Sequence, residues 1–221
     1  MFSQGIVVDP SNGGTADGTT TTVNLGRSNE LIVSELHGKY LEQCYRGNVY
    51  YGSTTTTGVV ISIATTKTPT YTIWNPAGSG KLIVPIVTLC GWNATTAALG
   101  TVIWTATTSA GASIATTAPF VTFTTPQTPV NANLGSGKVS VAKFGNESTT
   151  ISITAAATFY RSTGFTITPT TAATSVAPGW QWRDDWDGTS VIPPGNAIHL
   201  MGSTAFAAAL CVTTVWAEIP L

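Results

Sequence analysis

The sequence predicts an all-β protein, a sandwich or closed barrel of antiparallel strands, on three observations. From Val49 onward, threonine alternates with valine, isoleucine or phenylalanine, which is the period-two pattern of half-buried strands. Clusters of glycine, proline and asparagine separate these runs, and no helical pattern lies between them. Charged residues make up only 9% of the 221 positions, against about 25% in an ordinary soluble domain.

The N-terminal residues 1–27 are expected to form an extended, flexible arm. Residues 10–26 are mostly glycine, threonine, serine and asparagine, with almost no large apolar side chain. Such a segment cannot offset its own ordering entropy. Residues 28–221 are expected to form a single β-sandwich domain, which includes a helix at its start.

That helix is predicted over 28–46 and is short and amphipathic. Ser28 can cap its beginning and Gly47 can end it. Its apolar side chains recur at spacings of three and four, so they form one stripe that can pack on a sheet or on another subunit. The stripe consists of Val33, Leu36, Tyr40 and Cys44.

About nine or ten short strands are expected after the helix. Apart from the residues directly after Val49, the predicted runs are Val59–Ile63, Tyr71–Trp74, Lys81–Leu89, Val102–Thr105, Phe120–Phe123, Val139–Ala142, Ile151–Thr154, Ala197–Leu200 and Leu210–Trp216. Pro85 lies inside one of them, and because proline cannot donate to a ladder it should mark an edge strand or a bulge.

The scarcity of charge favours a structural subunit whose surface is covered in an assembly, because a lone monomer normally keeps a charged surface. With a net charge of −1 and no basic stripe, nucleic-acid binding is not expected. No apolar run reaches the 20 or so residues that span a bilayer, and the N-terminus lacks the features of a secretory signal. The three cysteines, Cys44, Cys90 and Cys211, are interpreted as buried reduced thiols, which fits folding in a cytoplasm.

Gly78-Ser79-Gly80-Lys81 superficially resembles a phosphate-binding loop. However, Asn75 occupies the place of the first glycine, Leu82 replaces the hydroxyl residue, and a strand follows where a helix is required. We interpret this segment as a hairpin turn.

Asp184, Asp185 and Asp187 form a local cluster of carboxylates, which could supply oxygen ligands to a cation such as calcium. The alternative is a solvated loop with an ion pair to Arg183, and this is the prediction we favour. We expect no metal, no cofactor and no catalytic site. The two histidines, His37 and His199, are far apart in the sequence and form no recognisable arrangement with the cysteines or acids.

Trp180, Trp182 and Trp186 lie in the same segment. They can close one end of the core, contact another subunit, or stack on sugars. Together with Leu36, Tyr40 and Tyr45 they are the candidate residues for a partner interface.

Several stretches resemble proteins encoded among the virion genes of tailed bacteriophages. They are Glu35–Tyr40, Tyr45–Val49, Asn75–Lys81, Ile192–Gly195 and the closing Trp216–Pro220. The resemblance implies a jelly-roll-like fold and a non-enzymatic structural role, as a cement or decoration protein on the capsid surface. It further implies contacts with the major capsid protein and with copies of itself, as a homotrimer. The alternative is a head-fibre or tail module that recognises host surface glycans through the tryptophan-rich segment.

Overall fold

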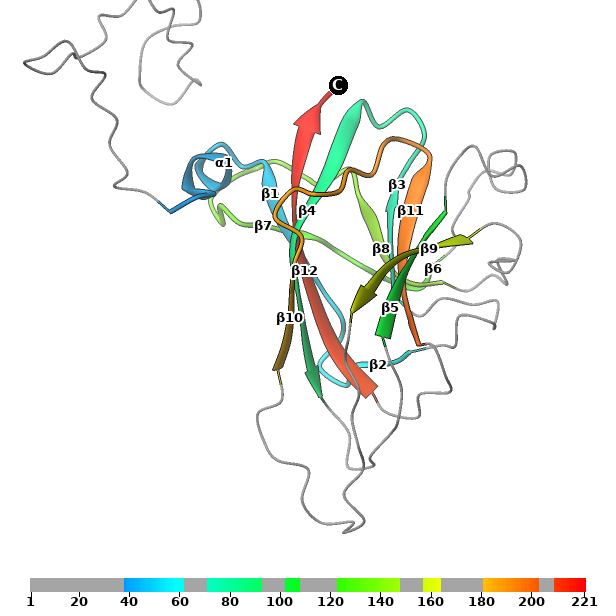
Figure 1. The fold of residues 1–221 in the computed structure, drawn as a ribbon. Helices are drawn as coiled ribbons and strands as arrows, with labels where there is room; N and C mark the ends of the chain where they lie inside the picture. Colours follow the sequence, from blue (N-terminus) through cyan, green and yellow to red (C-terminus); the bar gives the residue numbers. More distant parts are fainter. Residues whose placement is uncertain are drawn as a thin grey trace, which may run out of the picture. The chain divides into compact units, whose positions relative to one another are not determined.

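The computed structural model describes residues 38–61, 71–92, 102–107, 123–147, 157–163, 181–202 and 209–221 (Figure 1). These residues form one short helix, α1 (Leu41–Tyr45), and strands that follow one another along the chain. The strands are β1 (Val49–Ser53), β2 (Val59–Val60), β3 (Tyr71–Asn75), β4 (Lys81–Trp92), β5 (Val102–Thr107), β6 (Phe123–Gln127), β7 (Val130–Asn131), β8 (Lys143–Glu147), β9 (Ala157–Thr163), β10 (Gln181–Asp185), β11 (Asn196–Gly202) and β12 (Ala209–Pro220).

The chain divides into two units, Met1–Arg46 and Gly47–Leu221. In the first, α1 begins after a turn in which the Leu41 amide donates to the Gly38 carbonyl at 2.9 Å. The helix predicted over 28–46 is therefore described only at its C-terminal end, and its first part lies outside the described residues, as does the predicted arm 1–27.

The second unit is an antiparallel β-sandwich, which confirms the fold class predicted from the threonine alternation. One sheet has the strand order β10-β4-β12-β1-β7, with β2 also paired to β12. The other has the order β6-β8-β3-β11-β5-β9. Every strand pairing among the described residues is antiparallel.

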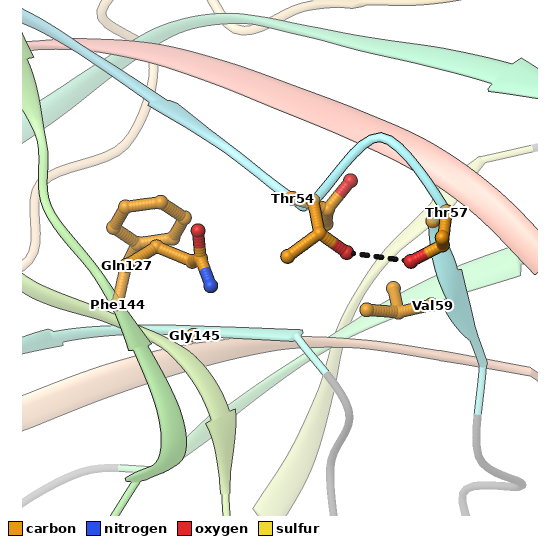
Figure 2. A pocket seen from close by; sticks show the side chains of 8 residues that line it. Thr54, Thr57, Val59, Gln127, Phe144 and Gly145 are labelled. Atoms are coloured by element: carbon orange, nitrogen blue, oxygen red, sulfur yellow. Dashed lines mark hydrogen bonds between the residues drawn. The ribbon is translucent and has the colours of Figure 1, made fainter.

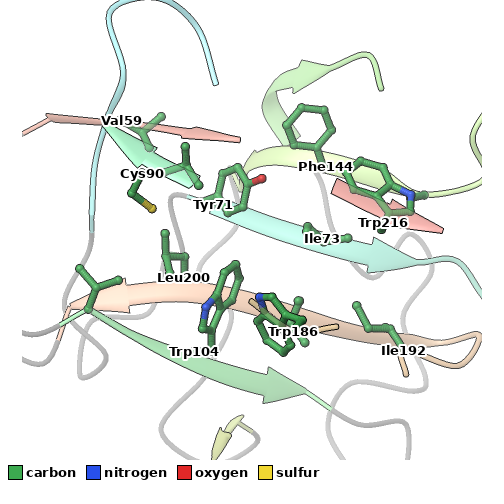
Figure 3. Close-up of a cluster of buried hydrophobic side chains, with 14 of the residues drawn as sticks. Val59, Tyr71, Ile73, Cys90, Trp104, Phe144, Trp186, Ile192, Leu200 and Trp216 are labelled. Carbon is green, nitrogen blue, oxygen red and sulfur yellow. The ribbon is translucent and has the colours of Figure 1, made fainter. Parts of the chain in front are cut away.

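Aromatic rings from both sheets fill the core between them (Figure 3). The ring of Trp104 on β5 packs edge-to-face on Tyr71 and on Trp186, at centroid distances of 6.3 and 5.2 Å. Phe144 on β8 packs in the same way on Trp216 of β12, at 6.1 Å. Edge-to-face pairs add stabilisation beyond the burial of their surface. The Phe144–Trp216 pair joins the two sheets, whereas Trp104 and Tyr71 lie on strands of the same sheet.

A hydroxyl seam, made by Thr88, Thr214, Tyr71 and the indole of Trp186, crosses the core. Trp186 Nε1 donates to Thr88 Oγ1 at 3.2 Å, and Thr88 Oγ1 lies 3.1 Å from Thr214 Oγ1. The Tyr71 hydroxyl, from the opposite sheet, donates to Thr214 Oγ1 at 2.8 Å. Burial raises the pKa of Tyr71, so the phenol keeps the proton that it donates.

Pro85 lies at a bulge, which is one of the two alternatives predicted for it. β12 pairs with β4 on one side there, whereas β10 pairs only with residues 87–91, so Pro85 lies just beyond the end of β10. The register between β4 and β12 shifts between Val215 and Trp216, where Trp216 lies opposite Pro85. The bulge accommodates a residue that has no amide hydrogen to give to the ladder.

The turn at Gly78–Lys81 is not a hairpin, so that interpretation is wrong. β3 and β4 belong to different sheets, and the residues between them carry the chain across the sandwich. The Asn75 amide fixes the crossing, because its Nδ2 donates to the carbonyls of Lys81 and Ile192, both at 2.8 Å. Gly78 and Gly80 supply positive φ angles of 78° and 68° that the turn requires.

The strand predicted over Val139–Ala142 is also wrong, since the chain is irregular there and β8 begins at Lys143. The backbone amides of Val141 and Ala142 donate to the carboxylate of Glu218 instead of to a neighbouring strand. A buried carboxylate that accepts backbone hydrogen bonds replaces the ladder at this point.

Candidate interaction surface

Four of the six predicted interface residues lie in the part of the chain that the structure describes. Leu36 and Trp180 lie outside the described residues. Tyr40, which is half-buried, precedes α1, and Tyr45 at the end of α1 is exposed. Trp182 on β10 is partly buried and packs against the core.

Trp186 is wrong as a partner contact, because it is fully buried. Its ring packs on Trp104, and its Nε1 donates a hydrogen bond to Thr88 Oγ1. Of the alternatives left open for this tryptophan, the structure supports a core residue, which can neither stack on a sugar nor reach another subunit.

The aspartate cluster is divided between different environments. Residues 181–185 form β10, so the prediction of a loop is wrong there. Arg183 and Asp185 form the expected exposed ion pair, with Arg183 Nη2 2.8 Å from Asp185 Oδ1. Asp184 points the other way and accepts a hydrogen bond from the buried Trp104 Nε1 at 3.2 Å. Nowhere in the described ranges do three or more His, Cys, Asp or Glu side chains gather as metal ligands would.

The remaining chemistry-bearing side chains have structural partners. His199 is buried on β11, with Nδ1 2.7 Å from Thr72 Oγ1, whereas His37 is outside the described residues. All three cysteines are free, and Cys90 is buried while Cys44 and Cys211 are half-buried. Burial, with a further contribution from the nearby Asp184 charge, raises the pKa of Cys90, so this thiol stays protonated and unreactive.

The outer face of the first sheet carries rows of apolar and hydroxyl side chains. One row crosses all five strands at Val130, Tyr51, Val215, Val87 and Asp185. The next row carries Ser53, Thr213, Leu89 and Arg183. Val130 and Tyr51 are 53% and 43% exposed. Charge on these two rows is confined to the Arg183–Asp185 pair at the β10 end, so most of this face presents neutral contact area.

A second exposed apolar feature is the Leu134 loop, residues 132–142 between β7 and β8. Leu134 and Val139 are 86% and 77% exposed. Asparagine side chains shape the tip: Asn131 Oδ1 accepts from the Asn133 amide at 2.9 Å, and Asn133 Oδ1 accepts from the Gly135 amide at 3.2 Å. Asn131 Nδ2 ties the loop to the Gly47 carbonyl at 2.9 Å. These bonds hold the tip in one conformation although Leu134 itself has no packing.

Glu218 on β12 anchors the other end of the Leu134 loop. Its carboxylate is buried and accepts hydrogen bonds from Ser140 Oγ, from the Val141 amide at 3.0 Å and from the Ala142 amide at 3.3 Å. Lys81 Nζ lies 2.9 Å from its Oε2 and balances the charge. A buried carboxylate that is paired and bonded in this way fixes the backbone around it.

A pocket of about 320 Å³ opens beside the turn that follows β1 (Figure 2). Its lining carries no charged side chain and consists of Thr54, Thr55, Thr57, Gly58, Val59, Gln127, Phe144 and Gly145. The hydroxyls of Thr55 and Thr57 lie 3.0 Å apart and bond to one another. We call this the threonine pocket.

The Leu134 loop and the threonine pocket were not among the residues expected from the sequence. A signal for the loop was present, because an isolated leucine stands among Asn131, Asn133, Gly135 and Gly137. A large apolar residue inside such a turn-forming segment cannot join a strand, so it is exposed on a fixed turn. The pocket has no such signal, since its residues come from separate strands.

No protein-family model matches the chain, and no curated protein and no solved structure is significantly similar to it. Among the helices described, none is both long and apolar enough to cross a membrane. The function is therefore argued from the surfaces above.

Proposed function

We propose that this protein is a structural subunit of a tailed-phage particle, a cement or decoration protein that binds the capsid shell from outside. The observation that carries the proposal is the outer face of the first sheet, where Tyr51 and Val130 are exposed and charge is confined to one ion pair. Such a face loses little by desolvation when another protein covers it, and that suits a clamp between shell subunits.

The strand connectivity supports the same proposal. Eight strands form the four-stranded orders β1-β12-β4-β10 and β3-β11-β5-β9, with the chain crossing repeatedly between the sheets. We infer that this is a jelly roll, the two-sheet arrangement of eight strands found in many capsid proteins. In this reading β6, β7 and β8 are an insertion between β5 and β9 that widens both sheets.

The energetics favour many modest contacts over one strong site. A standard interface buries about 1,600 Å² in total, and apolar area contributes about 25 cal/mol per Å². A neutral face of mixed apolar and hydroxyl side chains contributes less per area than a core, so a clamp of this kind needs several subunits engaged at once. We propose a homotrimer bound to the major capsid protein, located on the virion surface.

The experiment uses shells prepared from the phage without this protein. Purified protein is mixed with the shells, and the bound fraction is measured by pelleting and located by cryo-electron microscopy. Tyr51→Glu should weaken binding at least about tenfold, because it places a charge in the covered face, at a cost of about 1.4 kcal/mol or more. The matched control is Val191→Glu, which changes an exposed aliphatic residue outside the two rows that contain Tyr51 and Thr213.

Wild-type protein that fails to bind shells, or Tyr51→Glu protein that binds like wild type, would contradict the proposal. A glycan array runs beside it. Selective sugar binding that is lost in a folded Trp182→Ala variant would favour the receptor-binding alternative.

A further inference from the structure

We infer that the copies of this protein associate head to tail, with Leu134 of one copy inserted into the threonine pocket of the next. The inference deepens the proposed function and rests on it for the expectation that copies associate. Its starting point is the coexistence, on one body, of a fixed protruding leucine and a neutral pocket that no described side chain fills.

The Leu134 loop has the properties of a preformed anchor. A leucine that is 86% exposed is normally held loosely, yet hydrogen bonds from Asn131 and Asn133 fix this tip, and Glu218 fixes the other end of the loop. Because the loop is already ordered, little conformational entropy is lost when Leu134 becomes covered. A rigid aliphatic side chain entering a pocket is the arrangement that dominates many interfaces.

The threonine pocket has the matching properties. Its walls are threonine side chains and Val59, with Phe144 and Gln127 at one side (Figure 2), and its volume of about 320 Å³ admits a branched aliphatic side chain. No charged residue lines it, so no ion has to be desolvated when an apolar group enters. The same lack of charge leaves it without a charged partner for a phosphate or carboxylate ligand.

The loop and the first wall of the pocket are attached at opposite ends of β1, and Leu134 is 86% exposed, so it does not fill the pocket of its own molecule. The loop is attached where β1 begins, since the Ala132 amide donates to the Val49 carbonyl at 2.8 Å. The pocket begins at Thr54, directly after the last residue of β1. Five extended residues separate the ends by about 17 Å. The occupant must therefore come from a second molecule, and a contact between two different surfaces closes into a ring when its rotation allows, as in a trimer.

The test measures the oligomeric state by size-exclusion chromatography with light scattering, using the full chain. Leu134→Asp removes the anchor, Thr57→Arg fills the pocket, and Val191→Asp is the control that adds a charge at an exposed aliphatic position elsewhere. Circular dichroism verifies that each variant is folded. The wild type and the control should form a closed oligomer, whereas each single variant should be monomeric, with its dissociation constant raised about 30-fold or more.

Mixing the two single variants gives the decisive result. The Leu134→Asp copy keeps its pocket and the Thr57→Arg copy keeps its leucine, so a mixture should form one-to-one heterodimers and nothing larger. A two-fold symmetric interface would not give this outcome. The inference is overturned by a monomeric wild type, by a Leu134→Asp variant that keeps the oligomer, or by a mixture without heterodimer. It is also overturned if the wild type binds a neutral sugar, and the Thr57→Arg variant loses that binding but keeps the oligomer.

Shell binding separates this inference from the proposed function. Monomeric Leu134→Asp protein retains the outer face with Tyr51, so it should still pellet with shells, although more weakly because multivalency is lost. If the Leu134→Asp and Thr57→Arg variants bind shells and keep the oligomeric state of the wild type, the head-to-tail contact is overturned and the proposed function stays intact. A head-to-tail oligomer that does not bind shells would support the contact and overturn the proposed function.

Discussion

Replacing Glu218 with alanine tests how the Leu134 loop is held. The change removes a buried carboxylate and leaves Ser140 Oγ, the Val141 amide and the Lys81 ammonium without their acceptor, whereas the Ala142 amide keeps Ser140 Oγ at 3.1 Å. Each buried donor left without a partner costs about 1–3 kcal/mol. Water can reach part of the loop once it moves, so the total should be below that sum. We expect the free energy of unfolding to fall by about 2–4 kcal/mol, less than for a fully buried pair, because the Lys81 side chain is 30% exposed and can be hydrated.

Urea unfolding followed by tryptophan fluorescence measures this loss, and hydrogen exchange reports whether the amides of 136–142 lose protection. Asp185→Asn is the matched control, because it removes the charge of a carboxylate that, like its partner Arg183, is exposed to solvent. That variant should lose no more than about 0.5 kcal/mol. Equal losses in the two variants, or unchanged exchange in the loop, would refute the role assigned to Glu218.

Three further changes test the core. Gly52→Ala should destabilise by about 1–3 kcal/mol in urea unfolding, because a Cβ there would lie 2.7 Å from the Trp216 ring. In the control Gly137→Ala the added Cβ meets open space, so the variant should be close to neutral. Equal losses in the two variants would contradict this. Burial raises the pKa of Cys90, so the thiol ionises first in the unfolded chain. The free energy of unfolding should be constant below pH ~8.5 and about 1.4 kcal/mol lower near pH 9.5. Cys90→Ala should lose that decrease, and a variant with the same pH profile as the wild type would argue against a buried thiol. Trp186→Ala should cost about 3–5 kcal/mol in thermal or urea unfolding, and a loss below about 1 kcal/mol would mean that the ring is at the surface.

The alternation of threonine with β-branched residues was sufficient to predict the fold class, because successive side chains of a strand point to opposite faces. It does not report burial on one face in every strand, since β3 and β11 are buried along nearly their whole length. Strands with strong alternation, such as those at Tyr71 and Leu210, were located correctly. Val139–Ala142 has the same local pattern and is not a strand, because Glu218, 76 or more residues away, supplies the acceptor for its amides. The partner that decides such a segment is remote in the sequence.

The candidate surface was predicted less well, for a related reason. An aromatic residue near charged neighbours suggests exposure, yet Trp186 follows β10 and turns into the core, while Asp184 within β10 also points inward. Alternation along β10 assigns Arg183 and Asp185 to the outside. The threonine pocket joins Thr57 to Phe144, which no local pattern could associate.

The hydroxyl seam has a mechanical consequence. Thr88 and Thr214 lie side by side on neighbouring strands, and Tyr71 reaches them from the facing sheet. Sliding one sheet past the other by a single residue would leave the Thr88–Thr214 bond intact within its sheet, but it would break the bond from Tyr71 to Thr214 and leave that buried phenol without this acceptor in a water-free interior. The sandwich therefore resists slip in shear, and a pull on one layer is passed to the other without a change of register.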